Sequence, residues 1–168
     1  MQQTEGEEHA RLRRLVSPAF TARRAAAFRP RIERIVDRLL DGLDDGTGRV
    51  DFLTRFAQPL PMDVITELVG IPADRREDWR AYGAALAAVN RDPRVFPEPE
   101  RLDFGRPIGG HLGYAYGPHF CLGAALARVQ VEVAVVALLK RFPGLELIAA
   151  ERMPDPGAWR LSTLEVAL

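Results

Sequence analysis

Apolar residues in the first third of the chain recur every three or four positions, the spacing of one face of an amphipathic helix. The longest such run begins after Thr21, and its apolar members are Phe28, Ile32, Ile35, Val36, Leu39, Leu40 and Leu43. Thr21 can cap this helix, because its hydroxyl can accept a backbone N–H of the first turn. A shorter amphipathic helix is predicted over Glu7–Val16. Ser17-Pro18 ends it, because proline interrupts helical hydrogen bonding.

Shorter helical pieces are predicted after a turn at Asp44–Arg49. The first piece covers Asp51–Ala57 and the second Pro61–Val69. Gly70 ends the second piece, since glycine readily takes the left-handed conformation that follows many helices. Asp74 can cap a further helix that reaches about Ala88.

The second half of the chain has a different character. Residues 90–107 contain irregularly spaced prolines and are predicted as an ordered coil anchored by Phe96 and Phe104. A glycine-rich segment, residues 109–117, leads to a nearly all-apolar helix over Leu122–Phe142, which we expect to be central. The stretches "LELIAA" and "STLEVAL" are predicted as paired strands around a "PDPG" turn.

These elements predict a mainly α protein. Residues 1–88 are expected to form a helical segment. Residues 89–168 should hold the Pro-rich coil, a loop around the cysteine, the apolar helix and a small C-terminal β hairpin. A chain of 168 residues is of a size for one folded unit, so we expect the two parts to fold together.

Composition and charge exclude some functions. Lys plus Arg and Asp plus Glu both number 23, which argues against a dedicated binder of nucleic acid or of anionic membranes. The charged N-terminus shows no apolar region typical of a signal peptide. The apolar stretch from Leu122 to Leu139 is interrupted by Arg128, Gln130 and Glu132, which favours a buried helix over a membrane span. With one cysteine there is no internal disulfide, and we expect a cytoplasmic protein.

The one cysteine, Cys121, stands between a glycine-rich turn and the start of the apolar helix. Backbone N–H groups at a helix amino end favour thiolate over thiol. Gly117 lets the loop bend, and Gly123 leaves room for a flat group against the backbone. A thiolate beside a flat apolar surface suggests a heme ligand. The alternative is a small buried hydrophobe, the commoner role of a lone cysteine.

The segment "HLGYAYGPHFCLGAALAR" resembles the heme-binding signature of the cytochrome P450 family. That pattern places an aromatic residue, a glycine, a basic residue, the cysteine and a second glycine in order. Here they are Tyr114, Gly117, His119, Cys121 and Gly123. The resemblance implies that Cys121 is the axial ligand of heme b (iron protoporphyrin IX) and that His119 reaches a heme propionate. Tyr114 replaces the usual Phe, and Ala115 stands where Gly is common.

A second stretch, "EEHARLRRLVSPAFTARRAAAFRPRI", resembles the family's helix over one heme edge. His9 and Arg13 lie four residues apart, so they share one helical face and can hold the same anionic group. The resemblance gives both the heme propionates, whereas an arginine-rich helix without it would simply be a solvated surface.

The resemblance implies a heme-thiolate monooxygenase that inserts one oxygen atom of O₂ into a small organic substrate. Its electrons would come from a donor protein such as a ferredoxin. The resemblance also implies that the family's N-terminal portion is absent and that a large internal deletion falls near "AYGAALAAVN". The distal oxygen-activating helix and the Glu-x-x-Arg helix are lost there. Glu77/Arg80 and Glu98/Arg101 match that pair by spacing, which we interpret as coincidence. A non-catalytic heme-binding or scaffold protein, or an inactive fragment, is the alternative.

Overall fold

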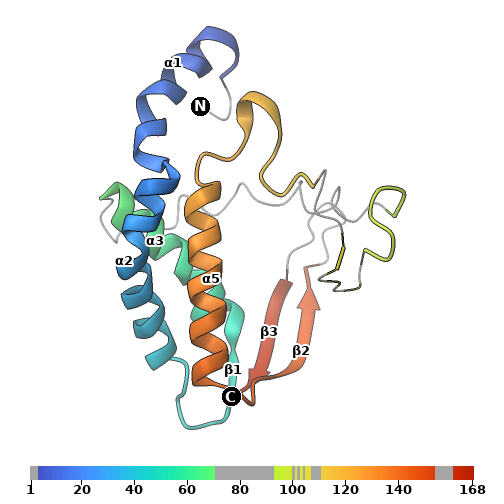
Figure 1. Cartoon of the computed structure of the whole chain (residues 1–168). Helices are drawn as coiled ribbons and strands as arrows, with labels where there is room; N and C mark the ends of the chain where they lie inside the picture. The colour runs from blue at the N-terminus through green and yellow to red at the C-terminus, as the bar shows by residue number, and fades with distance from the viewer. Residues whose placement is uncertain are drawn as a thin grey trace.

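A column of helices carries the cysteine loop near one end and a small sheet near the other (Figure 1). The computed structural model describes residues 4–70, 93–99, 101, 103, 105–106, 111–153 and 161–168. Its helices are α1 (Gly6–Val16), α2 (Ala22–Asp41), α3 (Pro59–Val69) and α5 (Ala124–Arg141), and its strands are β1 (Arg49–Asp51), β2 (Glu146–Arg152) and β3 (Leu161–Ala167). The prediction of a mainly α fold with a small C-terminal hairpin is confirmed.

The predicted amphipathic helices are present with nearly the predicted bounds. α1 ends where a 3₁₀ turn, Ser17–Phe20, begins. The Thr21 hydroxyl accepts the backbone N–H of Arg24 at 3.3 Å and so caps α2, as the sequence predicts. α3 begins at Pro59, two residues earlier than predicted, and Gly70 ends it at a φ of +73°. The apolar face of α2 forms the core with α3 and α5: Ala25, Phe28, Ile32, Ile35, Val36 and Leu40 are all buried.

The sheet has three antiparallel strands in the order β1-β3-β2. The hairpin of β2 and β3 is confirmed, while its "PDPG" turn lies outside the described residues. The prediction of one helical piece over Asp51–Ala57 is wrong at its start. Asp51 pairs with Glu165 in β1, and a π-helical turn follows over Leu53–Ala57. Three residues are too few for the alternation that identifies a strand, so the sequence alone did not indicate β1.

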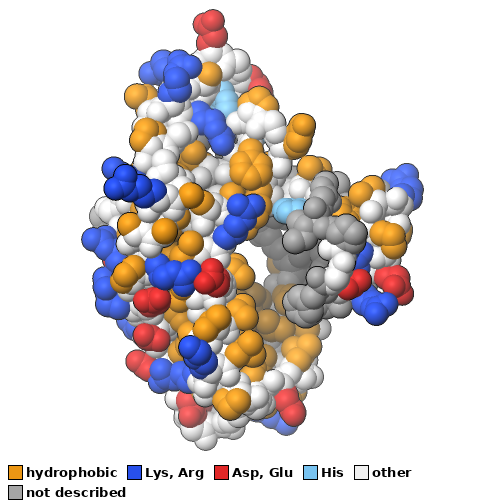
Figure 2. Space-filling view, viewed as in Figure 1, with side chains coloured by type: hydrophobic (Ala, Val, Ile, Leu, Met, Phe, Trp, Pro, Cys, Tyr) orange, Lys and Arg blue, Asp and Glu red, His pale blue; other side chains and the backbone are white. Residues whose placement is uncertain are grey.

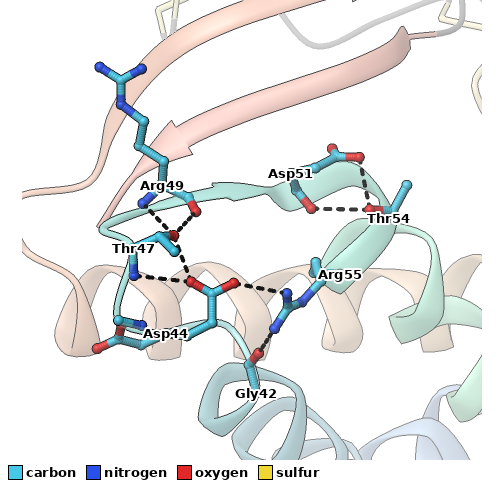
Figure 3. A network of polar contacts seen from close by, with 9 residues as sticks. Gly42, Asp44, Thr47, Arg49, Asp51, Thr54 and Arg55 are labelled. Carbon is cyan, nitrogen blue, oxygen red and sulfur yellow. Dashed lines mark hydrogen bonds and ion pairs between the residues drawn. The ribbon is translucent and has the colours of Figure 1, made fainter.

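Side-chain hydrogen bonds join the end of α2 to this strand (Figure 3). Asp45 accepts from the hydroxyl of Thr47 at 2.6 Å and from Arg55 at 3.2 Å, and these bonds lower the pKa of Asp45. Burial raises the pKa of Asp51, but hydrogen bonds from Thr54 and from the backbone N–H groups of Leu164 and Leu53 outweigh that effect and lower it. The network therefore stabilises the sheet against the helices most strongly when these carboxyls are ionised.

α5 matches its predicted bounds to within two residues at its start and one at its end, but it is not central. α2 covers one side of it. Four apolar side chains on the other side are exposed by 47–59%: Val131, Val135, Val136 and Leu139. Hydrophobic side chains lie on the surface of this region in Figure 2. The prediction failed because an all-apolar composition shows that a helix can be buried, not that the chain contains enough elements to bury it.

Contacts also join the two predicted segments of the chain. α2 packs on α5, and β1 pairs with β3, so elements from residues 1–88 and 89–168 share one core. Phe96 of the Pro-rich coil is half-buried. Phe104 and the helix predicted over Asp74–Ala88 lie outside the described residues. Among the described helices, none combines the length and the apolar character that crossing a bilayer would need.

Candidate functional site

The loop before α5 is closed by backbone hydrogen bonds around the cysteine. The Cys121 N–H donates to the Tyr114 carbonyl at 2.7 Å, and the Phe120 N–H donates to the Gly117 carbonyl at 3.0 Å. Gly117 opens a 3₁₀ turn, Gly117–His119, at a φ of +66°, a conformation that favours glycine. Cys121 is exposed and lies three residues before the first residue of α5. Its exposure does not fit the interpretation as a small buried hydrophobe.

Gly123 precedes α5 with an ordinary φ of −86°, so its backbone does not require glycine. A Cβ atom placed on Gly123 would meet nothing within 4 Å. The described part of the chain therefore leaves open space beside this backbone, next to the exposed sulfur. A side chain there would occupy space that a flat ligand could use.

Two departures from the family pattern have structural consequences. Ala115 has a φ of +57°, in the left-handed region where a Cβ costs about 1–2 kcal/mol, so its place in the pattern is one that glycine fits better. The Tyr114 ring lies 6.2 Å from the Phe120 ring, and the guanidinium of Arg128 lies 5.4 Å from the centre of the Tyr114 ring. Tyr114 therefore connects the loop to the first turns of α5.

α1 brings His9 and Arg13 to the same loop. The His9 side chain is buried, and its ring lies 4.2 Å from the ring of His119, centre to centre. Burial, His119 and Arg13 all lower the pKa of His9, which favours its neutral form. The Arg13 guanidinium donates to the backbone carbonyl of Phe120, the residue before Cys121. The face shared by His9 and Arg13 therefore lies against the cysteine loop.

His119 has a buried Nε2 atom that makes no hydrogen bond within the described residues. Oε1 of Glu5 lies 3.3 Å from this Nε2 atom, which is close enough for an ion pair, but the two atoms do not form a hydrogen bond. The Glu5 side chain is also 86% exposed. A buried polar atom without a partner is unfavourable, so an unpaired Nε2 indicates a position for another polar group.

A cavity of about 750 Å³ lies beside this histidine pair, between α1, the Ser17–Phe20 turn and the cysteine loop. Of the residues predicted for the site, His9, Arg13 and Gly117 line it. Tyr114, His119, Cys121 and Gly123 lie along the same loop but do not line this cavity.

The sequence analysis missed further lining residues, namely Ala10, Arg14, Ser17, Pro18, Thr21 and Pro118. The helical spacing of positions 10, 13, 14 and 17 was a signal that could have found the first three of these. Ser17 also donates to the Arg13 carbonyl at 2.7 Å, which joins the end of α1 to the following turn.

Of the two Glu-x-x-Arg pairs in the sequence, the structure describes one. Glu98 and Arg101 form an ion pair at 3.2 Å, and both side chains are about two-thirds exposed. The Arg106 guanidinium donates to the Glu98 and Arg101 carbonyls, so this pair belongs to the Pro-rich coil. Glu77 and Arg80 lie outside the described residues.

Comparisons with known proteins agree with this site. The family model described as "Cytochrome P450" matches residues 83–161. Cytochrome P450 107B1 of Saccharopolyspora erythraea is 27% identical over 304 aligned positions, which cover 98% of this chain and 74% of that protein. The aligned span is longer than the chain, so that relative contains residues without a counterpart here.

Two further matches differ in how much of each protein they cover. Biflaviolin synthase CYP158A1 of Streptomyces coelicolor is 43% identical over 57% of this chain and 25% of its own length. The crystal structure of P450BioI in complex with an acyl carrier protein superposes with a TM-score of 0.82 at 20% identity, covering 98% of this chain and 80% of that chain. With the cysteine loop, the family-model match and the shared fold in agreement, this chain belongs to the bacterial cytochrome P450 family.

Proposed function

We propose that this chain binds heme b through the thiolate of Cys121 and serves a monooxygenase reaction of cytochrome P450 type. Membership of the family implies a heme cofactor and an oxidoreductase function. The observation that carries the proposal is the exposed Cys121, held in a loop whose buried His119 Nε2 has no hydrogen-bond partner among the described residues.

The described side chains fit a heme in charge and in space. His9, Arg13 and His119 gather where a carboxylate would find donors, and the unpaired Nε2 of His119 is one of them. A propionate there would favour the charged form of His9, opposing the burial that lowers its pKa. Gly123 leaves open the space beside the sulfur that a porphyrin would need.

When bound, heme would supply the redox-active iron. The residues of the chain would ligate the iron and hold the heme in place. Cys121, which is exposed and lies three residues before the first residue of α5, would ligate the iron through its sulfur. The Tyr114 carbonyl, which accepts the Cys121 N–H, fixes the backbone of the ligand. His9 and Arg13, which line the cavity, and His119, whose ring lies against that of His9, would hold the propionates, and Gly117 permits the turn before His119. We propose a ferredoxin-like protein as electron donor and a small organic molecule as substrate.

A second candidate function is heme binding without oxygenation. It is favoured by the aligned span of cytochrome P450 107B1, which is longer than this chain, and by the exposed apolar side of α5. Productive oxygen chemistry needs water to be excluded from the iron. A chain that lacks the helices or loops which exclude water from the iron could still retain the cysteine loop and bind heme.

The absorption spectrum tests heme binding. The purified chain is loaded with hemin, reduced and exposed to carbon monoxide, and we expect the red-shifted Soret band of a thiolate-ligated heme. Cys121→Ala should abolish this band and leave the far-ultraviolet circular dichroism unchanged. His111→Ala is the matched control, because His111 is an exposed histidine of the same loop. A band typical of histidine ligation, unchanged by Cys121→Ala, would contradict the proposal.

Turnover separates the two candidates. The loaded chain is supplied with NADPH, a ferredoxin reductase and a ferredoxin, and substrate-dependent NADPH consumption and oxygenated product are measured. Coupled product formation supports the monooxygenase. A correct thiolate spectrum without any product from a broad set of organic substrates supports the heme-binding protein.

A further inference from the structure

α5 presents an exposed apolar stripe that nothing in the described part of the chain covers. Its members are Val131, Val135, Val136 and Leu139, whose exposed fractions lie between 47% and 59%. Steps of four, one and three residues place them on one side of a helix. Exposed apolar side chains gathered on one side of a helix favour an interface.

Two opposite charges lie symmetrically about the middle of this stripe. Glu132 stands four residues before Val136 and Lys140 four residues after it, and both are exposed. Glu132 accepts from Arg29 at 2.8 Å through Oε1. Lys140 makes no hydrogen bond or ion pair within the described residues. One helical turn separates each charge from Val136, so all three residues lie along the same side of α5.

The charges select the orientation of a second helix. If two copies of α5 cross antiparallel at Val136, each Glu132 comes opposite the other copy's Lys140. A parallel crossing would instead place like charges opposite one another, which is unfavourable. A symmetric antiparallel pair therefore covers the part of each apolar stripe that lies nearest Val136 and provides Lys140 with an acidic partner.

A groove beside the stripe supplies room for the side chains of the second copy. It lies between α2 and α5, has a volume of about 430 Å³ and includes Leu40, Val133 and Ala137 in its lining. Arg29, Asp37 and Lys140 line the same groove. Apolar side chains with charges around them are the usual composition of a protein interface.

We propose that this face is a homodimer interface, in which α5 of one copy packs antiparallel on α5 of a second copy and crosses it at Val136. The interface lies on the side of α5 that α2 leaves exposed, and it does not depend on heme. The dimer would bury the apolar residues that make α5 an exception to the rule that all-apolar helices are internal.

Sedimentation velocity of the full chain tests the interface. We expect a concentration-dependent dimer, and we expect Val136→Asp to raise its dissociation constant by at least about 100-fold, because the substituted residue meets itself at the crossing. Leu147→Asp is the matched control: Leu147 on β2 is 65% exposed, and its substitution should leave the dimer intact. Equal effects of the two variants, or a wild-type chain that stays monomeric at about 100 μM, would overturn the proposal.

Charge exchange tests the orientation. Lys140→Glu and Glu132→Lys should each weaken the dimer by about tenfold, since each places like charges opposite one another. The double variant Glu132→Lys/Lys140→Glu should restore it, because opposite charges face one another again. A double variant as weak as the sum of its single changes would exclude the antiparallel pairing.

The chain's one lysine makes cross-linking specific. A carbodiimide is applied to a mixture of ¹⁴N- and ¹⁵N-labelled chains, and the cross-linked peptides are identified by mass spectrometry. We expect mixed-isotope peptides joining Lys140 to Glu132 of the other copy. Same-isotope peptides alone, such as Lys140 joined to Asp37 within one chain, would contradict the interface.

Discussion

α2 and α5 lie side by side, yet only one of them has its apolar residues covered. On α2 the apolar residues occupy one face, and Ile32 and Val36 are completely buried. On α5 they occur all around the helix, and Val131 and Leu139 are each 59% exposed. The comparison teaches that a helix's pattern shows which side can be buried, whereas its neighbours decide how much of that side is buried.

The largest expected effect is a loss of stability at the covered face. Ile32→Ala should lower the free energy of unfolding by about 2–5 kcal/mol, because it leaves a cavity in the core. Val131→Ala on the exposed side of α5, measured at a dilution where the chain is monomeric, should change it by less than about 0.5 kcal/mol. Urea denaturation followed by circular dichroism measures both. Similar losses from the two variants would show that α5 is covered in solution.

A smaller effect is expected where α2 meets α3. Nη2 of Arg38 lies 2.6 Å from Oδ2 of Asp63, whose side chain is only 6% exposed. Arg38→Met should cost about 1–2 kcal/mol, since a buried carboxylate loses a charged donor while the arginine itself is largely solvated. Arg49→Met is the control, because its ion pair with Glu165 is 3.9 Å long and exposed. Denaturation at pH 7 compares the two variants, and a larger loss from Arg49→Met would contradict this interpretation.

Acid should weaken the connection between the covered helices and the sheet. The pKa of Asp51 is held below its ordinary value of 3.8, although burial alone would raise it, by hydrogen bonds from Thr54, Leu164 and Leu53. The carboxylate therefore contributes stability above the unfolded-state pKa, and this contribution is lost as the pH falls through the folded-state value.

Asp51→Asn should reduce the loss of stability between pH 6 and pH 2.5 by roughly 1 kcal/mol or less, the contribution of a typical hydrogen bond. Asp37→Asn is the control, because Asp37 is exposed and makes no hydrogen bond within the described residues. Denaturant titrations at the two pH values give the comparison. An unchanged acid sensitivity in Asp51→Asn would place the effect in other groups.

The smallest expected effect is a gain in the loop before α5. Ala115→Gly should raise stability by up to about 1 kcal/mol, because it relieves the left-handed strain at a φ of +57° while adding freedom to the unfolded chain. Ala127→Gly within α5 should instead cost about 1 kcal/mol. Thermal melts of the two variants should therefore shift in opposite directions. A loss in both would mean that the Ala115 strain is not present in solution.

Local patterns predicted much of this fold. The three-and-four spacing of apolar residues identified α2, and Thr21 and Gly70 marked helix ends. The cysteine signature located the loop, and the four-residue spacing of His9 and Arg13 predicted their common face. Strand β1 was missed because its three residues are recognisable only through their pairing with β3.

The sequence by itself determined where the long helices α2 and α5 lie, to within two residues, and which loop carries the sulfur, because each depends on neighbours only a few positions away. The tertiary structure decided that His9 lies against His119, that Asp51 ends a strand and that one side of α5 is exposed. These outcomes depend on contacts between distant segments, and on which covering elements the chain contains. Solvent exposure is a property of the assembled fold, and no local pattern encodes it.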